Sequence, residues 1–268
     1  MTGRDSRAAQ RRAASQSRTG LGTRDSKSKS PSIRVFSDAG AATRAAAEHL
    51  ASVLRQRGPR RVVLASGRTM VPVYRELVRL HRSGRAPFSR CSTWNLDELA
   101  VSPEDPRSFR SFMESQLFGQ VDLAPDRIHF LRGNAPDRSR ECRRFERELA
   151  RAGRPDLALV GIGVNGHVAY LEPSRALPPR TSRVRLSAST RRRLAEDGLD
   201  PVPREALTMG IETILEAREI VLVSVGKEKA GPLARALTGR VTPRLPASFL
   251  SLHPRLTVFA DRDAASLL

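Results

Sequence analysis

The chain has 268 residues, which is long enough for one large α/β domain or two small ones. Its formal net charge is +19, and arginine carries most of it, because the sequence contains only four lysines. A basic surface attracts nucleic acid, anionic membranes or phosphorylated metabolites. Aromatic residues make up only 4% of the chain, so stacking platforms for single-stranded nucleic acid are scarce.

The apolar runs and the cysteines indicate whether the protein is a membrane, secreted or cytoplasmic protein. No apolar run approaches the roughly 18 residues of a membrane span, and the N-terminus lacks the apolar core of a secretory signal. Cys91 and Cys142 show no CxxC spacing, which favours two reduced, buried residues. We therefore expect a cytoplasmic protein that has no membrane partner.

The first 32 residues differ in composition from the rest of the chain. They are rich in Arg, Ser, Gly and Lys and contain hardly any large apolar side chain, so they cannot bury enough surface to offset chain entropy. We expect residues 1–32 to form a disordered basic tail and residues 33–268 to form the folded domain. There are two alternatives for this tail: it makes weak contact with nucleic acid or membrane, or it serves as an organelle transit peptide.

From Ile33 onward, short apolar runs alternate with amphipathic stretches. Apolar, β-branched runs predict strands, and apolar residues at three- and four-residue spacing predict helices. In chain order we expect strands at 33–36, 61–65, 91–96, 128–131, 157–160, 219–225 and 256–260, and helices at 41–54, 71–82, 108–117, 138–152 and 229–237. This alternation predicts an α/β protein with a Rossmann-like, doubly wound, mostly parallel sheet and helices on both faces.

Two predicted strand ends are followed by features that suit an anion. Ligands of parallel sheets bind outside the carboxyl ends of the strands. The turn Ser66-Gly67-Arg68-Thr69 precedes a helix, where backbone N–H groups and the helix dipole favour an anion. Lys229 begins another helix, where the helix dipole disfavours a cation, so we expect its side chain to bind a negatively charged ligand. A plain helix cap and an exposed charged residue are the simpler alternatives.

Two further strand ends carry acid and base groups. Asp97 and Glu98 follow the third strand, and the segment Gly161-Ile162-Gly163-Val164-Asn165-Gly166-His167 follows the fifth, with Glu172 five residues beyond the histidine. A glycine cluster lets the backbone approach a ligand, and a histidine near a carboxylate suits proton transfer. A solvated acidic turn and a glycine turn with a surface histidine are the simpler alternatives.

One anionic site built from these four loops explains all of them. A phosphorylated substrate would be held by the turn at 66–69 and Lys229, while Asp97, His167 and Glu172 supply acid and base groups. No histidine has partners at metal-ligand spacing, so we expect no metal. The GxGxxG match at 161–166 follows a late strand and opens no clear helix, which argues against a dinucleotide site.

At these residues the sequence resembles the glucosamine-6-phosphate deaminase family, within the wider group that includes 6-phosphogluconolactonases. The matching segments occur in the family's order and cover roughly residues 33 to 262. They are residues 96–98, 106–113, 131–137, 161–167, 172–173, 180–181, 206–211 and 252–254. The segments Gly-Asn-Ala-Pro-Asp and Ala-Leu-Thr-Met-Gly-Ile point to deaminases rather than to lactonases.

The resemblance implies an enzyme of amino-sugar metabolism that converts glucosamine 6-phosphate and water to fructose 6-phosphate and ammonia, without metal or organic cofactor. His167 matches the histidine that assists ring opening, and Asp97 matches the base that moves the C2 proton to C1. Glu172 matches the carboxylate that tunes and orients the histidine, and Asn165 lies where the family has Asp or Asn. The implied partner is a small sugar phosphate rather than nucleic acid, and a homo-oligomer is compatible with the family.

The chain departs from the family around the expected substrate. The phosphate turn usually contains small residues and a proline, whereas this chain has Arg68, which either adds a bidentate phosphate contact or fills the pocket. Leu171 replaces the usual Asn before the Glu. The family's phosphate-binding arginine has no clear counterpart, and one residue within 191–193, where Arg191, Arg192 and Arg193 stand, is the candidate replacement.

These departures leave two other functions open. One is a 6-phosphogluconolactonase-type lactone hydrolase, which needs His167 as the base for water but has less need of Asp97. The other is a non-catalytic sugar-phosphate-binding regulator whose basic tail contacts nucleic acid.

Overall fold

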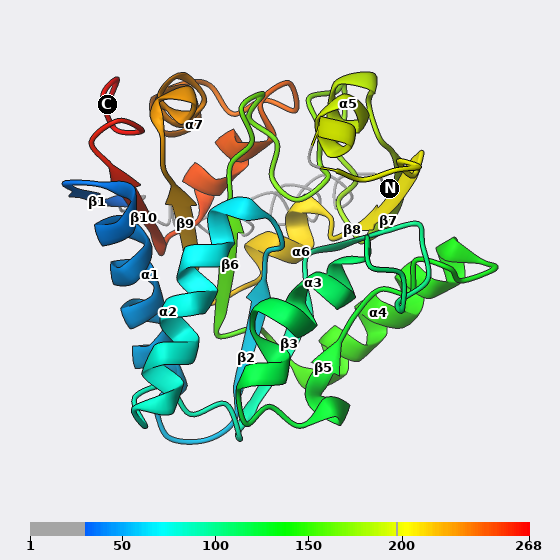
Figure 1. The fold of residues 1–268 in the computed structure, drawn as a ribbon. Coiled ribbons are helices and arrows are strands. Elements are labelled where there is room, and N and C mark those ends of the chain that lie inside the picture. The colour runs from blue at the N-terminus through cyan, green and yellow to red at the C-terminus, as the bar shows by residue number, and fades with distance from the viewer. Residues whose placement is uncertain (1–29, 197) are drawn as a thin grey trace, which may run out of the picture.

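The computed structural model describes residues 30–196 and 198–268 (Figure 1). Residues 1–29 of the predicted basic tail therefore lie outside the described residues, and Ser32 already belongs to the first strand. Within the described part, no helix combines the length and the apolar character that crossing a membrane requires.

A seven-stranded parallel sheet forms the centre of the fold. In spatial order its strands are β1 (Ser32–Phe36), β10 (Leu256–Asp261), β9 (Ile220–Ser224), β6 (Leu157–Gly161), β2 (Arg60–Leu64), β3 (Cys91–Asn95) and β5 (Ile128–His129). Every neighbouring pair runs parallel. The inner strands β6 and β9 are buried along almost their whole length, which is why they appear as continuous apolar runs in the sequence. The predicted α/β class is confirmed.

Helices cover both faces of this sheet (Figure 1). They are α1 (Ala39–Leu54), α2 (Val71–Arg82), α3 (Phe109–Gln116), α4 (Arg138–Ala152), α5 (Ala188–Glu196), α6 (Ile211–Leu215) and α7 (Ala230–Thr238). Short 3₁₀ segments are η2 (Arg68–Met70), η3 (Phe118–Gln120), η4 (Pro125–Arg127), η5 (Lys227–Lys229) and η6 (Pro246–Leu252). The side chains of Asp38, Ser108 and Asp137 cap α1, α3 and α4 by accepting a backbone N–H bond. Each predicted helix and strand is present within a few residues of its expected ends.

A second, antiparallel sheet was not predicted. It consists of β4 (Asp97–Leu99), β8 (Glu205–Thr208) and β7 (Ser182–Arg185), in that order. Asp97 and Glu98 therefore lie in a buried strand, and the solvated acidic turn that was considered for them is wrong. Three residues that pair with a partner far along the chain leave no local pattern, which explains the omission.

The strand order reverses between β2 and β6. After β2 the next strands of the large sheet are β3 and β5 on one side, whereas the strand after β6 is β9 on the other side. In a doubly wound sheet, this reversal opens a crevice at the carboxyl ends of the two strands, and ligands bind there. The loops after β2, β3, β6 and β9 are those that carry the predicted site residues.

Candidate active site

A cavity of about 1150 Å³ opens at the carboxyl ends of β2 and β6. Its walls come from the four loops singled out in the sequence, together with α3 and α5. The predicted site residues that line it are Ser66, Gly67, Arg68, Thr69, Asp97, Asn165, His167 and Lys229. The structure thus brings into one cavity all the predicted site residues except Glu172.

Two of the loops are built in the same way. Gly67 follows β2 with a φ of 113° and begins η2, and Gly226 follows β9 with a φ of 93° and begins η5. Glycine adopts such a positive φ without steric cost, so each chain turns sharply from its strand into a helix start. Both helix starts border the cavity, where their N–H groups and dipoles favour an anion.

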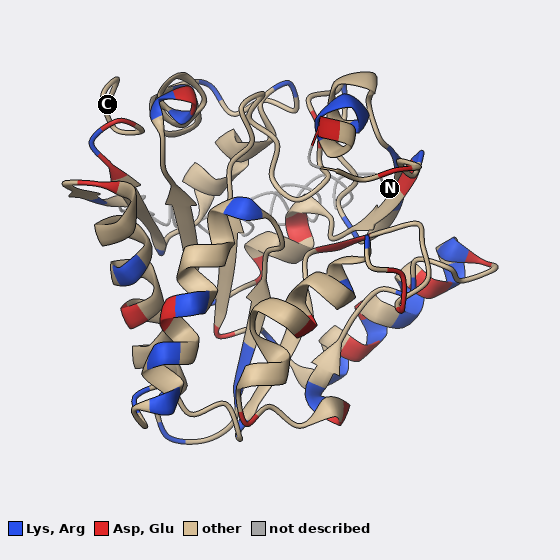
Figure 2. Ribbon diagram, in the orientation of Figure 1, with Lys and Arg blue, Asp and Glu red and all other residues tan. Residues whose placement is uncertain are grey.

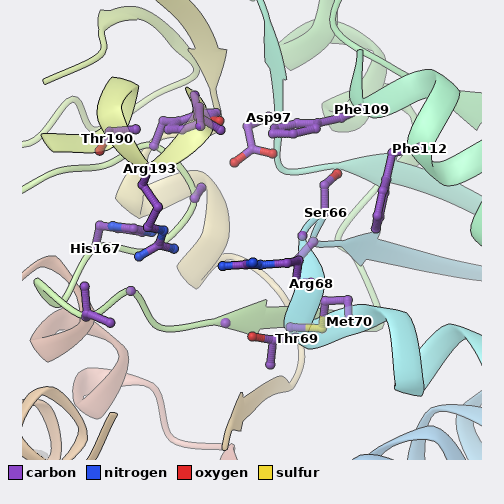
Figure 3. A pocket seen from close by; sticks show the side chains of 18 of the residues that line it. Ser66, Arg68, Thr69, Met70, Asp97, Phe109, Phe112, His167, Thr190 and Arg193 are labelled. Carbon is purple, nitrogen blue, oxygen red and sulfur yellow. The ribbon is translucent and has the colours of Figure 1, made fainter. Parts of the chain in front are cut away.

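Three cationic side chains gather at one end of the cavity. Lys229 is buried, and this burial, followed by the nearby charges of Arg193 and Arg68, lowers its pKa. Figure 3 shows the Arg68 side chain extending into the cavity toward the side on which Arg193 and His167 lie. Positive side chains grouped around a cavity attract an anion, so this end of the cavity suits a phosphate group.

Asp97 lies on another wall of the same cavity, next to Phe109 (Figure 3). Burial, and after it the charge of the adjacent Glu98, raises the pKa of Asp97 to about 8. A carboxyl group whose pKa is raised toward neutrality can take up a proton and return it during one reaction cycle. The geometry and the pKa of Asp97 therefore fit a proton shuttle.

Glu98 faces away from the cavity and connects β4 to α3. Its carboxylate accepts hydrogen bonds from the backbone N–H groups of Leu99, Phe109 and Arg110 at 2.7–2.9 Å. Burial raises the pKa of Glu98 to about 7, and the three N–H donors oppose this rise. Because Phe109 is the first residue of α3, these bonds also position the helix that forms the wall beside Asp97.

The His167 ring is held by its own loop. Its Nδ1 lies 2.7 Å from Asn165 Oδ1, and the same oxygen accepts the backbone N–H of His167 at 3.2 Å. Since an amide oxygen only accepts, Nδ1 carries the ring proton and Nε2 remains as an acceptor. The ring packs so closely against Gly163 that any side chain there would overlap it.

The electrostatic surroundings of His167 keep the ring neutral. Burial, followed by the charges of Arg193 and Lys229, lowers the pKa of His167 to about 4. Glu172 acts in the opposite direction, but more weakly than the other three causes. A neutral imidazole at pH 7 is ready to accept a proton from a substrate hydroxyl group.

Glu172 is the predicted site residue that the structure places outside the cavity lining. Its Oε1 accepts the backbone N–H of Ser187 at 3.4 Å, at the start of the segment that leads into α5. The His167 ring is oriented instead by the hydrogen bond that its Nδ1 donates to Asn165 Oδ1. The influence of Glu172 on the histidine is therefore electrostatic in this structure.

Helix α5 forms an outer wall of the cavity. Its lining residues are Ser189, Thr190, Arg193, Leu194 and Glu196. Of the three candidate arginines at 191–193, Arg193 lines the cavity, and Figure 3 shows its guanidinium group turned inward. The sequence left this choice open because three consecutive arginines give no sign of which one faces the cavity. That depends on the rotation of α5 about its axis, which tertiary packing sets.

Three aromatic side chains of the cavity wall were missed in the sequence. Phe109, Phe112 and Tyr170 line the cavity, and the rings of Phe109 and Tyr170 stack with centroids 5.9 Å apart. The stacked pair of Phe109 and Tyr170 excludes water from the region around Asp97 and so contributes to its raised pKa. Their positions in the sequence could have identified two of them as site residues, because Phe109 begins a helix and Tyr170 follows the glycine segment.

No group of three or more His, Cys, Asp or Glu side chains within residues 30–196 and 198–268 is arranged to hold a metal ion. Cys91 and Cys142 are free and buried, as predicted.

Comparison with known proteins identifies the family. The model of the glucosamine-6-phosphate isomerases/6-phosphogluconolactonase family matches residues 37–258. The chain belongs to this family. Among curated family members, glucosamine-6-phosphate deaminase 1 of Giardia intestinalis is 40% identical over 242 residues, which cover 89% of this chain and 91% of that protein. Glucosamine-6-phosphate deaminase 1 of Bacillus subtilis is 40% identical over 225 residues, which cover 83% of this chain and 93% of that protein.

Solved structures of the family agree with the fold. A monomeric glucosamine-6-phosphate deaminase superposes with a TM-score of 0.85 at 37% identity, over 88% of this chain and 100% of that one. The 6-phosphogluconolactonase of Thermotoga maritima superposes with a TM-score of 0.69 at 23% identity, over 86% of this chain and 99% of that one, a likeness of fold alone.

The two departures from the family pattern lie in different surroundings. Leu171 is buried in the hydrophobic core and does not line the cavity, so its replacement of a polar residue changes packing behind the site. Arg68 lines the cavity and extends into it (Figure 3). Of the two, Arg68 is therefore the change that alters the cavity itself.

Proposed function

We propose that this protein converts glucosamine 6-phosphate and water to fructose 6-phosphate and ammonia. The observation that carries the proposal is that Asp97 and His167 line one cavity whose other end gathers Arg68, Arg193 and Lys229. The proposal draws further support from the curated relatives, which are named glucosamine-6-phosphate deaminases. A cationic end and two proton-transfer groups match a sugar phosphate that must open its ring and isomerise.

The proposed reaction begins with ring opening at His167. The neutral ring accepts the proton of the C1 hydroxyl group at Nε2 and returns a proton to the ring oxygen, so the C1–O bond of the ring breaks and the aldehyde forms. Asn165 holds Nδ1 during this exchange. The proposed role of Glu172 is to stabilise the transient imidazolium by its charge.

Asp97 then performs the isomerisation. Its carboxylate removes the C2 proton while the aldehyde oxygen takes up a proton from the substrate's ammonium group, which gives an enolamine. Asp97 then returns its proton to C1, which leaves an iminium group at C2. Water adds to this iminium group and ammonium leaves, so fructose 6-phosphate is formed without a net change in redox state. The phosphate is held by the turn at Ser66, Gly67, Arg68 and Thr69, by Lys229, and by Arg193 of α5.

The chemistry proposed here runs on protein acid and base groups, so we also propose that it requires neither a metal nor an organic cofactor. We place the enzyme in the cytoplasm, where sugar phosphates are found, and its partner is a small molecule rather than nucleic acid. Gel filtration with light scattering will show whether it works as a monomer or as a homo-oligomer.

Ammonia release from glucosamine 6-phosphate by the purified protein tests the function. Asp97→Asn and His167→Gln each remove a proton-transfer group, and we expect kcat to fall by roughly 10²–10⁴-fold in each. Asp263→Asn is the matched control, because Asp263 is exposed and does not line the cavity. Full activity in both site variants contradicts the mechanism, and rapid 6-phosphogluconolactone hydrolysis without ammonia release assigns a lactonase instead.

A further inference from the structure

A second cavity of about 440 Å³ borders the loop that carries His167. Its lining residues are Asn165, Arg235, Gly239, Arg240, Thr242, Arg244 and Leu245. Three of these are arginines, and no carboxylate lines the cavity. The proposed reaction uses none of the three arginines, and they lie outside the lining of the first cavity.

The three arginines come from the end of α7 and the loop that follows it, and backbone hydrogen bonds fix this segment. Arg235 lies in the last turn of α7, and its carbonyl accepts the Gly239 N–H at 3.0 Å. Beyond it, the Thr242 carbonyl accepts the Leu245 N–H at 2.9 Å, and Ser248 Oγ accepts the Thr242 N–H at 2.9 Å. Figure 2 shows basic segments on α7 and on the loop that follows it, at one end of the molecule.

Several exposed arginines elsewhere in the described chain pair with acidic residues. Arg85 pairs with Glu48 at 2.8 Å, Arg180 with Glu216 at 2.5 Å, and Arg255 with Glu219 at 3.4 Å. The three arginines of the second cavity have no carboxylate within ion-pair distance among residues 30–196 and 198–268. Unpaired guanidinium groups around one hollow offer several N–H donors to the oxygens of a phosphate group.

The second cavity is in physical contact with the active-site loop. The Gly166 carbonyl accepts the backbone N–H of Ala247 at 2.9 Å, and Leu245 packs so tightly on Gly166 that no side chain fits there. Asn165 borders both cavities, and its Oδ1 is the atom that holds His167 Nδ1. A ligand in the second cavity therefore lies one side chain away from the histidine.

We propose that the cavity formed by Arg235, Arg240 and Arg244 binds the phosphate group of a small metabolite at a site separate from the substrate, and that its occupancy acts on His167 through Asn165. The binding part of this proposal is independent of the reaction assigned above. The effect on His167 rests on that proposed function.

Calorimetric titration with inorganic phosphate at low ionic strength tests the binding site. We expect two phosphate ions per chain in the unmodified protein, and one in the double variant Arg240→Ala with Arg244→Ala. The matched control is Arg140→Ala with Arg147→Ala, which removes two exposed charges from α4 and should keep both sites. Lys229→Ala should lose the other site, in the first cavity.

Two results overturn the binding site. One is the binding of two phosphate ions by Arg240→Ala/Arg244→Ala, whether or not that variant loses duplex DNA binding, and the other is an equal loss of phosphate in the α4 control. Since the titration needs no turnover, a failure of the proposed reaction leaves this test intact.

Inhibition of ammonia release by phosphate tests the action on His167. In the unmodified enzyme we expect phosphate to lower kcat as well as raise the apparent KM, because it occupies both cavities. In Arg240→Ala/Arg244→Ala, phosphate should raise the apparent KM alone. Purely competitive inhibition of both proteins contradicts the connection through Asn165.

Discussion

The carboxyl group of Asp97 has its raised pKa partly because Glu98 is its buried neighbour. Above about pH 7 Glu98 is charged, and this charge opposes the ionisation of Asp97. Asp97 must be ionised to act as the base, so kcat/KM should rise with pH through the pKa of about 8. Glu98→Gln removes the charge, and we expect the acid limb of the kcat/KM profile to move to lower pH.

The same variant distinguishes an electrostatic role of Glu98 from a purely structural one. A glutamine leaves one of the three N–H donors, that of Arg110 at the start of α3, without an acceptor, which costs about 1–3 kcal/mol of stability. That loss alone would lower kcat/KM equally at every pH and leave the limb in place. Glu104→Gln, which removes an exposed charge from a nearby loop, should leave the profile unchanged.

Helix α5 combines an exposed position with a part in the active site. None of its residues is buried, although several of them line the cavity. Elements with little buried surface open locally at low free energy cost. The guanidinium group of Arg193 turns inward (Figure 3), so in the proposed complex a bound phosphate contacts this helix through Arg193.

Fructose 6-phosphate, the proposed product, should therefore slow amide hydrogen exchange across residues 188–196. At 100 times Kd, binding can slow local opening by up to about 100-fold. Arg193→Ala should lose most of this protection, whereas Arg192→Ala, which changes an arginine outside the cavity lining, should keep it. Exchange in α4 serves as the internal reference. Equal protection in both variants would show that Arg193 does not hold the helix.

The two sheets differ in how far the sequence predicts them. Strands such as β6 and β9 are buried on both faces, so they stand out as apolar runs between helices. The small sheet has only three or four residues per strand and pairs Asp97 with Thr208. Its β4 carries two acidic residues that look exposed in the sequence and become buried only through that distant pairing.

The arrangement of the site follows from the whole sheet. The reversal of strand order between β2 and β6 places the ends of four strands around one crevice. For this reason Asp97, His167 and Lys229, far apart in the sequence, could be assigned to one site before any distance was known. The order of the strands does not predict the direction of a side chain. That direction turns Arg193 into the cavity and leaves Glu172 outside its lining.

The described residues contain both sheets, the core and both cavities, and the first strand begins at Ser32. Removal of residues 1–29 should therefore keep kcat/KM for ammonia release and change Tm by no more than about 2 °C. The full-length and shortened chains are compared for turnover, thermal unfolding and binding to duplex DNA at two salt concentrations. A shortened chain that unfolds earlier or loses activity contradicts the proposed domain boundary. Salt-sensitive DNA binding without turnover in the full chain, abolished by the deletion, favours a sugar-phosphate-binding regulator, because charge neutralisation by the basic segment would then supply the affinity.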